Sequence, residues 1–331
     1  MGDQMTRVAI VGGAGFVGHN LAFFLKINSH EVMCLDSLVV NNLVHCASNG
    51  NSKYVGFIQD RLELLARNDI PLIVADARDY HEMSRDIGRF KPDVIIHLAA
   101  VAHIDRSNKD PYTTFDHSLR TLENSLDVAR AIGAKIIYFS SSTVYGDFSA
   151  PRITEDEPLK PQGIYGNLKL AAERMCMAYN QVYDMPVCIV RPQALYGPRC
   201  VSGRVTQKFI EQAIAKEPLI INGTGKERHD FTFIDDLSDG VGRIVKSDWK
   251  GLKIYNLTGE ADTSLSELAE IVAKRYPTKI EYGAPDTDKP ARGVMICDRI
   301  RADLGYEPKW SIQRGMAAYM DFYDAKKFSR S

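Results

Sequence analysis

The sequence predicts an α/β protein built on a doubly wound parallel sheet, with a smaller α/β lobe towards its C-terminus. Short, continuously apolar segments recur along the first 190 residues, and helical patterns separate them. Beyond that point glycine and proline interrupt the chain more often. Apolar strands that alternate with helices form parallel sheets whose two faces are both covered. We therefore expect a large domain over 1–190 and a lobe over 191–331, with some segments of the lobe returning to the sheet.

The expected elements are arranged in a regular order. Six strands are predicted at 7–11, 31–35, 72–75, 94–98, 135–139 and 186–191. Helices are predicted near 54–67, 79–90, 112–132 and 163–183, and in the lobe at 204–216, 235–247 and 264–275. In such sheets ligands bind beyond the carboxyl ends of the strands, so the residues just after each strand are the first candidates for a site.

The first strand runs directly into a glycine-rich segment. Gly13, Gly15 and Gly18 fit the pattern GxGxxG, and Gly12, Gly15 and Gly18 fit the related GxxGxxG. Small residues let the backbone turn tightly and let a pyrophosphate approach the amide groups of a helix N-terminus. The second strand ends at Asp36, and an acid about 20 residues beyond such a loop accepts hydrogen bonds from an adenosine ribose. Because Asp36 would also repel a 2′-phosphate, this Rossmann-type pattern favours NAD over NADP.

Composition and charge exclude several classes of protein. The chain has 331 residues, of which 45% are apolar and 25% charged, with a formal net charge of −1. Near-zero charge gives no support for nucleic-acid binding, and no apolar run or signal peptide indicates a membrane protein. The six cysteines form no CxxC pair and the eight histidines lack ligand spacing, so we expect reduced thiols and no metal site. A cytoplasmic location is expected.

Tyr165 and Lys169 are the main catalytic candidates. In the predicted helix 163–183 their spacing of four residues puts both side chains on one face. A free phenol has a pKa of about 10, and a neighbouring cation lowers it. The pair is therefore a candidate general base for removing a proton from an alcohol near neutral pH.

Taken together, these motifs resemble the extended short-chain dehydrogenase/reductase family, in its nucleotide-sugar epimerase/dehydratase branch. The matching segments span nearly the whole chain in the family's order: 12–18, Asp36, 76–77, 97–100, 140–146, 165–169, 191–198 and 230–236. The resemblance implies NAD as cofactor and a nucleotide-diphosphate sugar as substrate. It also implies a homodimer formed through the helices 112–132 and 163–183.

The resemblance further implies roles for individual residues. Tyr165 would be the catalytic base and acid, Lys169 would hold the nicotinamide ribose and lower the tyrosine pKa, and Ser141 would bind the reacting hydroxyl. The expected cofactor-binding residues are Gly12, Gly15, Phe16, Val17, Gly18, Asp36, Asp76, Ala77, Leu98, Ala99, Ala100, Tyr165 and Lys169. The expected substrate-binding residues are Ser142, Thr143, His103, Tyr196, Arg199, Arg204, Lys208, Arg228 and Arg292. As a group, the cations among the latter suggest a pyrophosphate site, since arginine forks match phosphate oxygens.

The reaction depends on the fate of the sugar once hydride has been removed. Dehydratases of this family usually carry Asp-Glu after the catalytic serine or threonine, whereas this chain has Ser142 and Thr143, which cannot do the same proton transfers near neutral pH. This favours an epimerase. Against it, the segment 98–107 looks more like the dehydratase version, in which His103 would be a second titrating group.

Other departures and alternatives stay open. Ala194 stands where many relatives have a substrate-contacting asparagine, and His229 occupies the position of a usual arginine, with Arg228 just before it. The segment 115–118 lacks the asparagine-rich start common in epimerases. We favour an epimerase that oxidises the sugar at C4; the alternatives are a 4,6-dehydratase or other lyase or decarboxylase, a keto-sugar reductase or dehydrogenase, and a non-catalytic NAD-binding protein.

Overall fold

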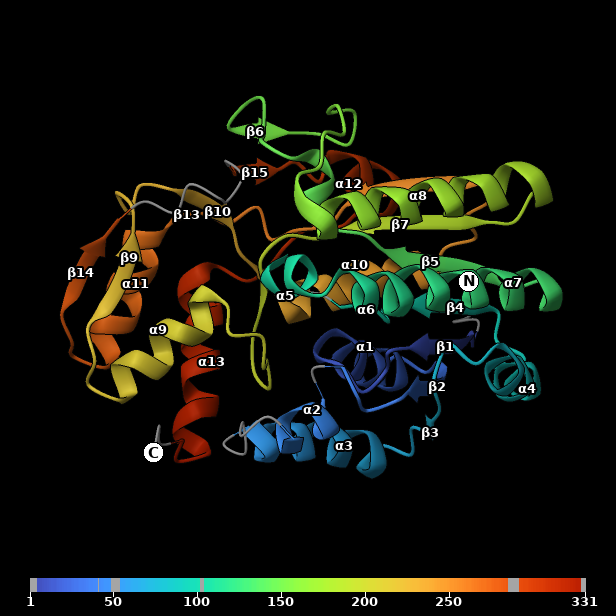
Figure 1. Cartoon of the computed structure of the whole chain (residues 1–331), viewed down its shortest axis with the longest axis horizontal. Coiled ribbons are helices and arrows are strands. Elements are labelled where there is room, and N and C mark those ends of the chain that lie inside the picture. The colour runs from blue at the N-terminus through green and yellow to red at the C-terminus, as the bar shows by residue number, and fades with distance from the viewer. Residues whose placement is uncertain (1–4, 41, 49–53, 102–103, 285–291, 329–331) are drawn as a thin grey trace.

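Seven parallel strands form the main sheet, in the spatial order β3-β2-β1-β4-β5-β7-β12 (Figure 1). The computed structural model describes residues 5–40, 42–48, 54–101, 104–284 and 292–328. The strands of the sheet are β1 (Arg7–Val11), β2 (Glu31–Asp36), β3 (Leu72–Val74), β4 (Val94–His97), β5 (Lys135–Phe139), β7 (Val187–Arg191) and β12 (Leu252–Asn256). The six predicted strands are confirmed, with ends that differ by at most one residue.

Helices cover both faces of this sheet because neighbouring residues of each central strand point in opposite directions. Val8 and Ile10 of β1 pack in one core, and Ala9 and Val11 pack in the other. The first core is covered by α1 (Phe16–Ile27), α3 (Val55–Arg67) and α10 (Ile234–Lys246), and the second by α4 (Tyr80–Phe90), α7 (Thr121–Ile132) and α8 (Gly163–Tyr183) (Figure 1). This arrangement confirms the predicted doubly wound α/β fold.

The predicted helix 112–132 is interrupted. It consists of α6 (Pro111–Phe115), a π-helical turn η2 (Asp116–Arg120) and α7. Asp110 begins it by accepting a hydrogen bond from the backbone N–H of Thr113 at 3.1 Å, and Pro111 occupies the first helical position, where its missing N–H costs nothing. Two further short helices lie earlier in the chain: α2 (Leu43–Ser48) after β2, and α5 (Ile104–Lys109) directly before α6.

The C-terminal part of the chain forms a smaller lobe of helices and short strands, at the left of Figure 1. Its helices are α9 (Val205–Ile214), α11 (Leu265–Arg275) and α13 (Ile312–Ala325), whereas α12 (Asp298–Leu304) contacts β12 and α10 in the larger domain. Its paired strands are β9 (Leu219–Asn222) with β14 (Ile280–Gly283), β10 (Arg228–Asp230) with β13 (Asp262–Ser264), and β11 (Thr232–Phe233) with β8 (Leu195–Tyr196). One more pair joins β15 (Val294–Met295) to β6 (Arg152–Ile153), which connects this part of the chain to the larger domain.

Two segments from this part of the sequence belong to the larger domain, one as a strand of the sheet and one as a helix on its face. Strand β12 pairs in parallel with β7, and α10 packs on the same face as α1. The sheet therefore contains segments from both sides of residue 190. The division into domains at that residue stays a prediction.

All six cysteines are buried free thiols. In the described ranges, no helix combines the length and the apolar character needed to cross a lipid bilayer.

Candidate active site

The candidate site lies where the strand order reverses. The chain moves from β1 outward to β2 and β3, and then crosses to β4 on the other side of β1. The loops after β1 and β4 therefore diverge beyond the carboxyl ends of the strands, which is the place where sheets of this kind bind ligands. The turn after β5 and the N-terminal part of α8 lie beside this point, since β5 pairs with β4 and α8 contacts the turn.

The glycine-rich segment is packed too tightly for larger residues. Gly12 has a φ of +86°, and a Cβ there would lie 2.9 Å from the backbone nitrogen of Ala99 in the loop after β4. A Cβ on Gly18 would lie 2.4 Å from the carbonyl oxygen of Gly12. Helix α1 begins at Phe16, and the residue before it, Gly15, is the N-cap and offers no side-chain hydrogen bond. The first-turn amide groups thus have no competing side chain, which fits a pyrophosphate at this helix end.

Asp36 lies at the edge of this loop. Its carboxylate accepts hydrogen bonds from the backbone N–H groups of Ala14 at 3.0 Å and Leu38 at 2.8 Å. Burial raises the pKa of Asp36, and these two hydrogen bonds oppose the rise. The carboxylate is therefore oriented partly by Ala14 of the glycine-rich segment and partly by Leu38 just after β2, and this arrangement fits the ribose of NAD.

Asp76, the second acidic candidate, is paired with a residue that the sequence did not single out. Arg78 donates to Asp76 at 2.6 Å, which holds the pKa of that carboxyl below its usual range, and it also reaches Asp116 in η2 at 2.6 Å. Asn124 donates to the carbonyl oxygen of Ala77 at 2.8 Å and fixes this loop against α7. Asp76 and Ala77 lie just after β3, the strand that pairs with β2, at whose end Asp36 lies.

Ser141, Tyr165 and Lys169 come together from two elements. Tyr165 and Lys169 lie one turn apart on α8, and less than a tenth of each residue is exposed. The ammonium of Lys169 lies 5.9 Å from the centre of the Tyr165 ring and donates to the carbonyl oxygen of Phe139 at 2.6 Å. Ser141 begins the 3-10 turn η3 (Ser142–Tyr145), which contacts α8, and its side chain lies near enough to Tyr165 to lower the pKa of that phenol.

The close approach of α8 to this turn depends on a residue without a side chain. A Cβ on Gly166 would lie 3.1 Å from both the carbonyl oxygen of Thr143 and the side chain of Pro161. The helix is also fixed at its start, where the backbone N–H of Ile164 donates to the side chain of Asn108 at 3.1 Å. Direct packing of α8 on the turn therefore brings the Tyr165 side chain close to Ser141.

The expected effect of Lys169 on the Tyr165 pKa is wrong in this structure. Burial raises the pKa of Tyr165, and the influences that oppose the rise are the charge of Arg204 and the hydrogen bond with Ser141. Burial also lowers the pKa of Lys169 to about 8, against the attraction of Glu173. Desolvation therefore outweighs the influences that lower the Tyr165 pKa, and Lys169 is not among those influences.

Three of the expected substrate-binding arginines have partners within the protein. Arg199 donates to His19 of α1 at 3.0 Å. Arg228, at the exposed start of strand β10, pairs with Asp262 at 2.5 Å. Arg292 donates to the backbone carbonyl oxygens of Ser142 and Gly146, which lie in the segment just after Ser141 (142–146, hereafter the serine turn). The sequence could not show these partners, because each lies far away along the chain.

The other expected substrate residues are placed differently. Arg204 and Lys208, at the start of α9, are exposed, and their side chains have no hydrogen-bond or ion-pair partner among the described residues. Ser142 and Thr143 are buried in the serine turn, and the Thr143 hydroxyl has no partner within the described part of the chain. Tyr196 is fully buried between Phe231 and Phe233, and His103 lies outside the described residues.

A buried ion pair that the sequence analysis missed supports the whole site. Glu173 and Arg191 are joined by two hydrogen bonds of 2.9 and 2.7 Å, and at most 2% of either side chain is exposed. Ser140 also donates to Glu173 at 2.5 Å, and Arg191 donates to the Tyr145 hydroxyl at 2.9 Å. The signal available in the sequence was the position of Glu173, one helical turn beyond Lys169.

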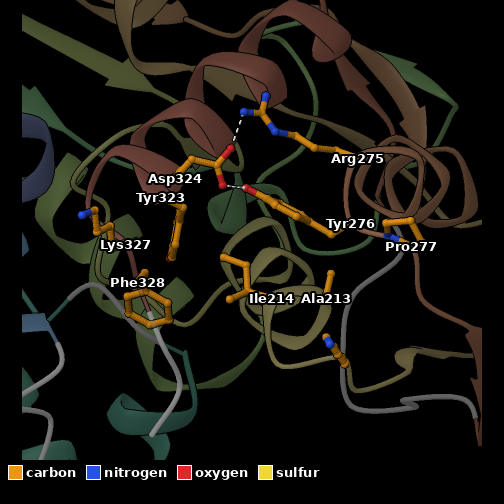
Figure 2. A pocket seen from close by; sticks show the side chains of 10 residues that line it. Ala213, Ile214, Arg275, Tyr276, Pro277, Tyr323, Asp324, Lys327 and Phe328 are labelled. Carbon is orange, nitrogen blue, oxygen red and sulfur yellow. Dashed lines mark hydrogen bonds and ion pairs between the residues drawn. The ribbon is translucent and has the colours of Figure 1, made fainter.

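A separate cavity opens in the C-terminal lobe, between α9, α13 and the segment after α11 (Figure 2). It has a volume of about 380 Å³, and the aromatic rings of Tyr276, Tyr323 and Phe328 are among the side chains that line it. Across its rim, Asp324 accepts hydrogen bonds from Arg275 and from Tyr276 (Figure 2). None of the site residues predicted from the sequence lines this cavity, so it is not the candidate active site.

Comparison with known proteins defines the class. Residues 8–258 match the family model described as the NAD dependent epimerase/dehydratase family. The chain is 28% identical to UDP-glucuronic acid decarboxylase 4 of Arabidopsis thaliana, over 95% of this chain and 67% of that protein. It is also 28% identical to UDP-glucose 4-epimerase of Mycolicibacterium smegmatis, over 97% of this chain and 99% of that protein.

A solved structure supports the fold. The UDP-glucuronic acid 4-epimerase of Bacillus cereus, crystallised with UDP-glucuronic acid and NAD, superposes with a TM-score of 0.86 over 97% of this chain and 99% of that one, at 24% identity. The chain is a member of the NAD dependent epimerase/dehydratase family, since the family model covers most of its length. The epimerase/dehydratase family and the NAD cofactor expected from the sequence are confirmed.

The buried pair provides a stability prediction. Glu173→Gln leaves the Arg191 guanidinium buried without its anion, and we expect it to lower the free energy of unfolding by about 3–5 kcal/mol. The matched control is Glu63→Gln, which removes an exposed pair with Arg67 whose side chains are 56% and 78% exposed. The control change should be within about 0.5 kcal/mol. Denaturant unfolding of the two variants checks this, and equal losses would contradict it.

Proposed function

We propose that the protein is an NAD-dependent epimerase of nucleotide-diphosphate sugars, with Ser141, Tyr165 and Lys169 as its catalytic residues. The observation that carries this proposal is the placement of Ser141 beside Tyr165, with Lys169 one helical turn away, at the switch point of the sheet near the glycine loop. The glycine loop, Asp36 and the loops after β3 and β4 would hold NAD.

The proposed mechanism assigns the proton to Tyr165. When bound, NAD supplies the acceptor for a hydride from C4 of the sugar and the donor that returns it. Tyr165 takes the proton of the C4 hydroxyl as hydride leaves, which produces a 4-keto sugar, and gives the proton back after the sugar has turned over. Ser141 hydrogen-bonds the same oxygen and orients it. Lys169, fixed by the carbonyl oxygen of Phe139, would hold the ribose, with its ammonium 5.9 Å from the centre of the phenol ring.

Isomerisation is favoured over loss of water because of the two residues after Ser141. Ser142 and Thr143 have hydroxyl side chains, which cannot act as the acid and base that remove water near neutral pH. A decarboxylase is the second candidate. Its support is the similarity to UDP-glucuronic acid decarboxylase 4, and a ketone at C4 of a uronic acid activates the neighbouring carboxylate for loss of carbon dioxide without a second acid/base pair.

The remaining contacts are also proposals. Arg204 and Lys208 are the cations best placed for the diphosphate, since neither side chain has a partner among the described residues and the charge of Arg204 acts on Tyr165. A homodimer through α6 to α8 is supported by exposed apolar side chains, because Tyr112 is 84% and Val182 is 68% exposed. The cytoplasmic location and a role for His103 stay predictions.

The proposal is tested by incubating the purified protein and NAD with UDP-, dTDP-, GDP- and CDP-linked hexoses and with UDP-glucuronic acid. We expect an isomer of unchanged mass from one of them, identified by mass and sugar stereochemistry together. A product lighter by one water would assign a dehydratase, and one lighter by carbon dioxide a decarboxylase. Conversion of none of these sugars by the NAD-bound protein would contradict all three.

The second prediction concerns the catalytic base. Tyr165→Phe should reduce turnover by about 10²- to 10⁴-fold, because the variant has no group to exchange the proton. Its unfolding temperature and bound NAD should stay close to those of the wild type, since the ring is retained. Tyr179→Phe, on the same helix, is the control and should keep full activity. Normal turnover by Tyr165→Phe would exclude the mechanism.

Cofactor preference gives a third prediction. Asp36→Asn removes the charge that repels a 2′-phosphate. It keeps an acceptor oxygen for only one of the two N–H groups, those of Ala14 and Leu38, because each binds a different carboxylate oxygen of Asp36. The ratio of NADP affinity to NAD affinity should rise by about tenfold or more. Asp248→Asn changes an exposed carboxylate that pairs with Lys135 and should leave the ratio unchanged. Titration of both cofactors measures the two affinities, and an unchanged ratio in Asp36→Asn would argue against the ribose contact.

A further inference from the structure

The serine turn is held by an arginine from the far end of the sequence. One terminal nitrogen of Arg292, Nη1, donates to the carbonyl oxygen of Ser142 at 3.2 Å and to that of Gly146 at 2.9 Å. These two carbonyl groups lie at the start and just beyond the end of η3, the turn that Ser141 begins. A single guanidinium therefore spans the turn that presents the proposed catalytic serine.

Contacts of its side chain and of the residues that follow it hold Arg292 in position. Its guanidinium lies over the ring of Phe148, 5.5 Å from the ring centre. The next residue, Gly293, accepts a hydrogen bond at its carbonyl oxygen from Gln193 at 3.1 Å. A Cβ on Gly293 would lie 2.3 Å from the carbonyl oxygen of Pro151, so the two backbones are in direct contact. The pairing of β15 with β6 continues this contact.

The side chain of Tyr145 ties the turn to Arg191 and Asn256, but the backbone of the turn has few other hydrogen bonds. Within it, the backbone N–H of Val144 reaches Ser141 at 3.3 Å and that of Gly146 reaches Thr143 at 3.2 Å, which are long for such bonds. From outside, the N–H of Ser142 donates to the carbonyl oxygen of Pro192 at 3.0 Å. Because the carbonyl groups of Ser142 and Gly146 face a charged donor, the two bonds from Arg292 are the strongest of those that the backbone of the turn makes.

We propose that Arg292 is a positioning residue, which holds the Ser142–Gly146 turn so that Ser141 meets Tyr165, and that it is not a ligand of the substrate diphosphate. This replaces the role expected from the sequence. The inference rests on the proposed catalytic role of Ser141. Its consequence is that removal of Arg292 affects the chemical step more than the binding of the nucleotide sugar.

The experiment compares Arg292→Met and Arg292→Lys with the wild type, all loaded with NAD. Hydrogen–deuterium exchange is monitored in peptides that contain residues 142–148. We expect exchange there to be about tenfold faster or more in Arg292→Met, because two charge-assisted hydrogen bonds are lost. Arg292→Lys should restore part of the protection, since an ammonium can still donate to one carbonyl group.

Kinetics separates the two roles. With the sugar of the panel that is turned over fastest, kcat of Arg292→Met should fall by about 10- to 100-fold while KM stays within about twofold. A large rise in KM with little change in kcat would overturn the inference and return Arg292 to the substrate. Unchanged exchange in 142–148, or faster exchange with normal kcat, would also overturn it.

Arg243→Met is the matched control. Arg243 likewise donates through one terminal nitrogen to two backbone carbonyl groups, those of Leu304 at 3.0 Å and Gly305 at 2.8 Å. Its removal should speed exchange near residue 305 and leave both the 142–148 peptides and kcat unchanged. If the wild type turns over no nucleotide sugar, the proposed function fails, while the exchange comparison still decides whether Arg292 holds the turn.

Discussion

The buried ion pair between Glu173 and Arg191 is the interaction on which the rest of the site depends. Glu173 belongs to α8 and Arg191 ends β7, so the pair fixes the catalytic helix to the sheet. Through Ser140 and Tyr145 it also reaches both ends of the serine turn, and Tyr145 donates to Asn256 of β12 at 2.6 Å. Two buried charges are tolerated here because nearly every polar atom of the pair has a partner.

Burial has a cost for the chemistry that the site must perform. It raises the pKa of Tyr165 and lowers that of Lys169 to about 8, and both shifts oppose the charged forms. Glu173 reduces the second shift by placing a negative charge one turn from Lys169. The same carboxylate thus fixes the helix and helps to keep the lysine protonated.

Charged side chains from the C-terminal part of the chain also serve to join the two parts of the molecule. Arg199 reaches His19 of α1, and its carbonyl oxygen accepts two hydrogen bonds, of 3.0 and 2.6 Å, from the buried Arg61 of α3. Arg292 reaches the serine turn. Because arginine carries several donors on a long side chain, it can hold a distant loop through backbone carbonyl groups.

The sequence by itself determined the doubly wound sheet, the glycine loop, the helix α8 and the family. These features depend on local patterns, since apolar runs, glycine spacing and the four-residue separation of Tyr165 and Lys169 are readable from neighbouring residues. The tertiary structure alone decided the partners of Arg199, Arg228 and Arg292, the direction of the Tyr165 pKa shift, and the place of β12 at the edge of the sheet. Each of these depends on contacts between residues far apart in the chain and on the loss of water around them, which no local pattern records.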